Sequence, residues 1–86
     1  ASTKEIDGFK MMIKVLEESS EGITSEELQT KIYEIGMKLE FEKLRDWFSA
    51  FYEVVLGQKE GPRIGSFIKF YGKENSITLL KKRMEN

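Results

Sequence analysis

The sequence predicts an all-α protein, a compact bundle of about five helices. Apolar residues recur at helical spacing in successive segments, and no segment alternates apolar and polar residues as a β-strand does. Glycines and the single proline fall between these segments, where helices are expected to end or begin. The 86 residues are enough for one hydrophobic core, so we expect a single domain over residues 1–86.

An apolar face at positions i, i+3, i+7 and i+10 predicts the first helix; it consists of Ile6, Phe9, Ile13 and Leu16. This helix is expected to end near residues 19–22. The second helix is indicated by a capping box, with Thr24 as the N-cap and Glu27 at the third helical position. Its buried stripe is expected to be Leu28, Ile32, Ile35 and Leu39. Gly36 interrupts this stripe either as a tolerated weakness or as a point of close packing.

The third helix is expected over residues 42–56, with one face made of Leu44, Phe48, Phe51 and Val55. Trp47, Tyr52 and Val54 widen this face, which is typical of a central helix contacted from more than one side. Gly57 is expected to end the helix in a left-handed conformation.

Two shorter helices complete the predicted bundle. Gly61 is expected to be the N-cap and Pro62 the first residue of a fourth helix that continues to Tyr71 and stops at Gly72. The fifth helix is expected from about Glu74, with Ile77, Leu80 and Met84 directed inward.

The composition argues against several kinds of chemistry. The chain has no histidine and no cysteine, which removes histidine-based catalytic triads, histidine and thiolate metal sites, and disulfides. Gly57, Gly61 and Gly65 have the wrong spacing for a phosphate-binding loop, and no Lys-Ser or Lys-Thr pair follows them. We therefore expect no catalytic residue, no cofactor and no metal ligand in these residues.

Hydropathy and charge suggest where the protein acts. No apolar run approaches the roughly 18 residues of a membrane span, so we expect a soluble cytoplasmic domain without a membrane partner. Residues 1–56 carry seven basic and twelve acidic side chains, a net charge of −5, whereas residues 57–86 carry seven basic and three acidic ones, a net charge of +4. Binding of a polyanion is therefore expected in the C-terminal third, through Lys59, Arg63, Lys69, Lys73, Lys81, Lys82 and Arg83. Alternatively, the lysine-rich last helix complements its own dipole and keeps the domain in solution.

The predicted start of the fourth helix is a candidate phosphate site. Free amides at a helix N-terminus attract a phosphate oxygen, and Arg63 places a guanidinium beside them. Gly65 and Ser66 are small enough to let a sugar-phosphate backbone approach. In the alternative interpretation, the glycines serve tight turns and helix crossing, and Arg63 pairs with Asp46 or Glu53.

Aromatic side chains are the candidates for stacking on an unpaired base, namely Trp47, Tyr33, Tyr52 and Tyr71. Their helical spacing also fits a place in the core. For Trp47 both possibilities are retained, and for Tyr52 and Tyr71 we expect a half-buried ring with an exposed hydroxyl.

Several motifs follow one another in the second half of the chain: Leu44-Arg45-Asp46-Trp47-Phe48, Leu56-Gly57-Gln58, Gly61-Pro62-Arg63, Gly65-Ser66-Phe67 and Tyr71-Gly72. This order resembles the C-terminal end of class I lysyl-tRNA synthetases, most specifically over residues 44–80. The resemblance implies an all-helical cage domain that receives the anticodon end of a lysine-accepting tRNA. It also implies that the chain is a fragment of a longer enzyme, which fits a first residue other than methionine.

In that family, the catalytic domain of the same polypeptide ligates lysine to tRNA with ATP. Its two catalytic signatures, one rich in histidine and one a lysine-serine-lysine loop, are not in this chain, so no ATP, lysine or magnesium site is assigned here. Two alternatives remain at this stage. The bundle can hold a partner helix in an apolar groove, or it can act as a structural buttress for the catalytic domain.

Overall fold

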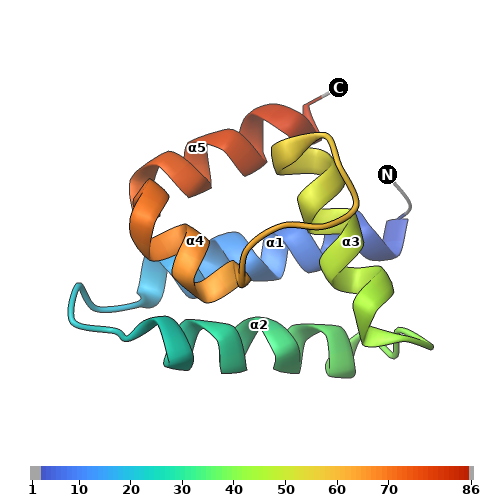
Figure 1. Ribbon diagram of the computed structural model, residues 1–86, viewed down its shortest axis with the longest axis horizontal. Coiled ribbons are helices and arrows are strands. Elements are labelled where there is room, and N and C mark those ends of the chain that lie inside the picture. The colour runs from blue at the N-terminus through green and yellow to red at the C-terminus, as the bar shows by residue number, and fades with distance from the viewer. Residues whose placement is uncertain (1–2, 86) are drawn as a thin grey trace.

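The computed structural model describes residues 3–85 and contains five helices, as the sequence predicts. In chain order these are α1 (Thr3–Glu18), α2 (Ser25–Lys38), α3 (Leu44–Leu56), α4 (Ile64–Tyr71) and α5 (Lys73–Met84). In Figure 1, α1 and α2 run in opposite directions, α3 stands at one end of this pair, and α4 and α5 close the other sides. The predicted all-α bundle is therefore confirmed.

The N-terminus of α2 has the predicted capping box. The hydroxyl of Thr24 accepts a hydrogen bond from the amide of Glu27, and the carboxylate of Glu27 accepts one from the amide of Thr24, both at 3.0 Å. These two bonds satisfy donors that would otherwise have no partner at the helix start. They fix where the chain turns from α1 into α2.

One hydrophobic core runs through the molecule, and α1 contributes to it by contacting α2, α3 and α5. The predicted faces of α1 and α2 are mostly buried, with Met12 as an additional core residue and with Ile6 and Leu39 only partly buried. In α3 the buried face is centred on Trp47, Ala50 and Phe51, so the face predicted through Leu44 and Val55 is rotated away from the true centre. Trp47 is fully buried and takes the central place where α3 meets α1 and α2.

The indole of Trp47 fills the space between α1 and α2. It is buried, its ring lies 5.5 Å from the rings of Phe9 and Phe41, and its Nε1–H donates to the carbonyl of Ile32 at 3.0 Å. Gly36 on α2 and Gly8 on α1 lie against the indole with no side chain between. Gly36 is therefore a point of close packing.

Two glycines end helices in conformations that other residues rarely adopt. Gly57 ends α3 with φ 73°, as predicted, and its amide donates to the carbonyl of Glu53. Gly72 has φ 104° and ψ 138° and is the single residue between α4 and α5. Its amide donates a hydrogen bond to the carbonyl of Ile68 at the end of α4, and its carbonyl accepts one from the amide of Ser76 in α5.

Candidate nucleic-acid interface

The start of α4 differs from the sequence-based prediction. The helix begins at Ile64, and its N-cap is Arg63 with φ −55° and ψ 134°, so neither Gly61 nor Pro62 belongs to it. The hydroxyl of Tyr52 donates to the carbonyl of Pro62 and ties this segment to α3. That contact holds the Gly61-Pro62 step outside the helix, and the predicted proline-initiated turn is wrong.

The first amides of α4 are also less available to an anion than predicted. The amide of Gly65 donates to the side-chain carbonyl of Gln29 at 2.8 Å, and Ile64 and Gly65 are both buried. A Cβ at position 65 would collide with the backbone carbonyl of Ser25 in α2. Gly65 therefore serves helix crossing, which was the alternative interpretation.

Arg63 itself remains accessible. Its side chain is exposed, and among residues 3–85 it forms no ion pair with Asp46 or Glu53. The alternative that Arg63 is a structural ion-pair partner is therefore wrong. The guanidinium is free to bind an anion from solution, although beside the helix start and not within its first turn.

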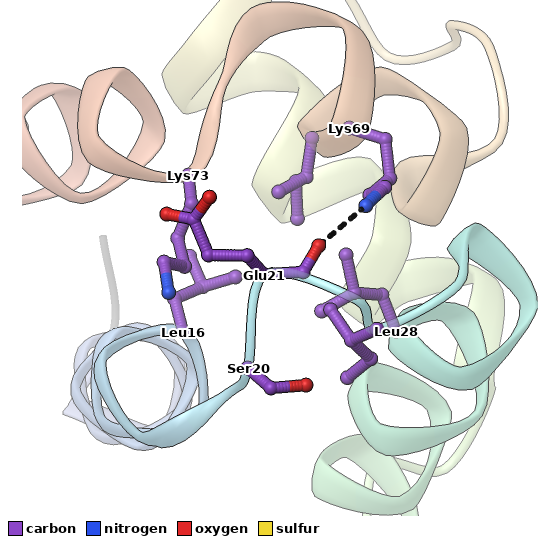
Figure 2. A pocket seen from close by; sticks show the side chains of 8 residues that line it. Leu16, Ser20, Glu21, Leu28, Lys69 and Lys73 are labelled. Atoms are coloured by element: carbon purple, nitrogen blue, oxygen red, sulfur yellow. Dashed lines mark hydrogen bonds between the residues drawn. The ribbon is translucent and has the colours of Figure 1, made fainter.

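Lys69 and Lys73 hold the connection between α1 and α2. The ammonium of Lys69 donates to the carbonyl of Glu21 at 3.4 Å, and that of Lys73 donates to the carbonyl of Ser19 at 2.8 Å. Figure 2 shows both lysines at the edge of a hollow of about 170 Å³, between Leu16 of α1 and Leu28 of α2. These two lysines are partly committed to the fold, so they are weaker candidates for phosphate contact.

The remaining cations lie at two other places. Lys81 forms an ion pair with Glu17 of α1 at 3.5 Å, and it is followed by Lys82 and Arg83 in the last turn of α5. Lys59 lies in the segment between α3 and α4. Lys59, Lys82 and Arg83 are exposed, and within the described chain they form no ion pair. Of the seven candidate cations in the C-terminal third, these three and Arg63 are therefore the ones that remain available; we call these four residues the free cations.

The aromatic candidates differ in accessibility. Trp47 is buried, and the N–H of its indole already donates to the carbonyl of Ile32, so the ring is not accessible for stacking on a base. Tyr52 is partly buried, and burial raises the pKa of its hydroxyl. Tyr71 is 40% exposed, but its ring stacks on Phe67 at 5.4 Å. Tyr33 is 45% exposed on α2.

Sequence reasoning did not single out Phe70, which is the most exposed large apolar side chain described, at 91%. The buried face of α4 consists of Ile64, Gly65 and Ile68. Phe70 is two positions beyond Ile68, which at about 100° per residue places it on the opposite side of the helix. This signal was present in the sequence, but reading it required knowing which face of α4 is buried.

The outward side of α2 is the electrostatic opposite of α4. A shallow groove there is lined by Glu26, Glu27, Thr30, Lys31 and Glu34. The hydrogen bonds from the backbone and side chain of Thr24 hold the pKa of the Glu27 carboxyl below its usual range. Three glutamates against one lysine give this groove a net negative charge. A polyanion is therefore repelled from this side and directed to other parts of the surface.

Residues 3–85 contain no group of three or more acidic, histidine or cysteine side chains placed to hold a metal ion. Nor do they include a helix with the length and apolar character needed to cross a bilayer.

Comparison with known proteins gives one clear relationship. Over 73 residues, 85% of its length, the chain is 41% identical to the lysine–tRNA ligase of Rickettsia bellii. The chain matches a segment of lysine–tRNA ligases. The same identity and coverage are found with the proteins of that name from Rickettsia felis and Rickettsia prowazekii. The chain spans about 14% of the length of these relatives. No protein-family model and no solved structure matches it.

Proposed function

We propose that this chain is the C-terminal helical domain of a class I lysyl-tRNA synthetase and binds the anticodon end of a lysine-accepting tRNA. The observation that carries the proposal is the 41% identity to a segment of proteins named lysine–tRNA ligase. The class and the anticodon end come from the motif order over residues 44–80. The all-helical fold is consistent with both.

The charge distribution supports a role in binding. The free cations Lys59, Arg63, Lys82 and Arg83 all belong to the C-terminal third, whose net charge is +4. Neutralising phosphates releases condensed counterions, which makes such binding favourable and strongly dependent on salt. In this proposal the domain supplies affinity and orientation for the tRNA.

The chemistry of the proposed enzyme takes place elsewhere in the polypeptide. A catalytic domain activates lysine with ATP and transfers it to the tRNA in the cytoplasm. The binding domain described here contributes by positioning the tRNA, which lowers the entropic cost of bringing its acceptor end to the reacting groups.

Binding of a lysine tRNA transcript to this chain, measured by fluorescence anisotropy from low to moderate salt, tests the proposal. With about four phosphate contacts, one for each free cation, we expect a slope near −3 in a plot of log affinity against log salt. A tRNA whose anticodon stem-loop has been deleted serves as the control and should bind more weakly. Absence of binding to the intact tRNA at the lowest salt would contradict the proposed function.

A charge reversal at Arg63 tests whether the α4 side takes part. Arg63→Glu is expected to weaken tRNA binding and to make the salt slope less steep, because one phosphate contact is lost and a repulsion replaces it. Arg45→Glu is the matched control, since Arg45 is an exposed arginine in the acidic part of the chain. Equal losses in both variants would indicate only a general effect of net charge.

A further inference from the structure

We propose that the exposed ring of Phe70 is a platform on which one unpaired base of the RNA stacks, with Arg63 holding a phosphate beside it. This inference rests on the proposed function and names a contact that would carry it. Phe70 lies on α4, and Arg63 is the N-cap residue of that helix.

Arg63 and Phe70 stand at the two ends of α4, on its outward side. Phe70 follows Arg63, the N-cap residue, by seven residues, so the backbone positions of the two residues lie on the same side of α4, about 10 Å apart along its axis. Ser66 lies between them, is exposed, and presents only a small hydroxyl. The long side chain of Arg63 can therefore reach a phosphate adjacent to a base that lies on Phe70.

The helix that carries Phe70 is fixed at both ends. The inner face of α4 is buried, and the bond from the amide of Gly65 to Gln29 fixes the helix start on α2. Gly72 then fixes the helix end, because its amide bonds to the carbonyl of Ile68. Phe70 is thus presented from a helix held at both ends, so little backbone entropy is lost when a ligand binds to the ring.

The segment around Phe70 is positively charged. Between Glu60 and Glu74 the chain contains three cations, Arg63, Lys69 and Lys73, and no acidic residue. An aromatic ring presented from a cationic segment matches the chemistry of a nucleotide, which combines a flat apolar base with an anionic phosphate. The exposed Tyr33 of α2 lacks this match, because the groove on the outward side of its helix is lined by three glutamates and only one lysine.

The size of the exposed apolar surface also favours a base over a protein partner. A groove for a partner helix needs an apolar patch of several hundred Å². Along the outward side of α4, by contrast, Phe70 is preceded by Ser66 and Arg63, which are polar, and the neighbouring Tyr71 is stacked on Phe67. One open ring is the size of one base, and stacking on such a ring is worth about 1–3 kcal/mol.

The experiment measures binding of a lysine tRNA transcript to wild type, Phe70→Ala, Phe70→Leu and Phe70→Tyr. We expect Phe70→Ala to weaken binding about 5- to 140-fold, the equivalent of one stacked base, and Phe70→Tyr to stay within about twofold of wild type. Phe70→Leu keeps an apolar side chain without a π-face and should resemble Phe70→Ala.

Tyr33→Ala is the control variant. It removes an exposed aromatic side chain from α2 and should leave the affinity for tRNA unchanged. Circular dichroism of each variant verifies that the fold is retained, as expected for a side chain that is 91% exposed.

A spectroscopic readout separates stacking from other contributions. An anticodon stem-loop carrying 2-aminopurine at one loop position at a time should show a fluorescence change on binding wild type that is absent with Phe70→Ala. If wild type binds tRNA and both Phe70→Ala and Phe70→Leu bind it as tightly as wild type does, the stacking platform is refuted while the proposed function stands. If wild type does not bind tRNA, the proposed function fails and this inference fails with it. Loss of affinity in Phe70→Ala with full affinity in Phe70→Leu would identify an apolar contact and would also refute stacking.

Discussion

Trp47 and Gly36 pack so closely that a Cβ placed on Gly36 would lie 2.6 Å from Cδ1 of the indole. The indole cannot retreat, because a Cβ on Gly8 of α1 would lie 2.5 Å from Cζ3 on the other side. The ring is also held by the bond from its Nε1–H to Ile32. The absence of side chains at these two glycines therefore determines how closely α1, α2 and α3 approach one another.

Gly36→Ala is expected to destabilise the protein by about 1–2 kcal/mol. Overpacking against the rigid indole costs about 1–3 kcal/mol, and the better helix propensity of alanine offsets up to about 1 kcal/mol of that. Urea unfolding monitored by Trp47 fluorescence measures the difference. Gly22→Ala is the control, because a Cβ at Gly22 would meet nothing within 4 Å. An unchanged midpoint for Gly36→Ala would show that the indole has room to move.

Gly65→Ala is expected to be more damaging than Gly36→Ala. The atom that a Cβ would meet is the backbone carbonyl of Ser25, and a backbone cannot change rotamer as a side chain does. We expect α4 to be displaced from α2 and the bond from the amide of Gly65 to Gln29 to be lost. Relative to wild type, amide hydrogen exchange in the variant should be accelerated more in α4 than in α1. Protection of α4 equal to that in wild type would contradict the close crossing.

Trp47→Phe is expected to lower the free energy of unfolding by about 1–3 kcal/mol. The smaller ring leaves a cavity between Gly8 and Gly36, and the substitution removes the N–H that donates to the carbonyl of Ile32. For a domain of this size, each kcal/mol corresponds to a shift of about 4–8 °C in Tm. Calorimetry measures this shift, with Trp47→Tyr as a second variant whose hydroxyl supplies a different hydrogen-bond donor in place of the indole N–H. A Tm within 2 °C of wild type would argue that Trp47 is less tightly packed.

The capping box predicts a pH dependence of stability. The pKa of Glu27 is lowered from 4.5, first by its hydrogen bond with the backbone of Thr24. Its carboxylate therefore contributes stability above pH 4.5, and this contribution is lost as pH falls through the lowered pKa. In urea unfolding at pH 6 and pH 3, Glu27→Gln should lose less stability than wild type over this interval. Glu26→Gln leaves the capping box intact and should behave more like wild type.

The sequence predicts those features of the fold that depend on neighbours along the chain. The capping box at Thr24 and the left-handed Gly57 are local, and the structure has both where they were predicted. The start of α4 was wrong because the hydroxyl of Tyr52, ten residues earlier, binds the carbonyl of Pro62. No local pattern encodes that contact.

The candidate site was predicted less well than the fold, for the same reason. The excess of basic residues in the C-terminal third was visible in the sequence, but the sequence did not show that Lys69 and Lys73 are bound to the carbonyls of Glu21 and Ser19. The burial of Trp47 depends on glycines in two other helices. The exposure of Phe70 follows from which face of α4 meets α2, and that is a tertiary fact.

The single-residue joint at Gly72 makes the last helix sensitive to insertion. One extra residue there would turn α5 by about 100° about its own axis relative to α4. Leu80 would then leave the interior, and Lys81 would move away from Glu17. Natural length variation is therefore expected in the segment between α3 and α4, and we expect the step from Tyr71 to Lys73 to keep its length.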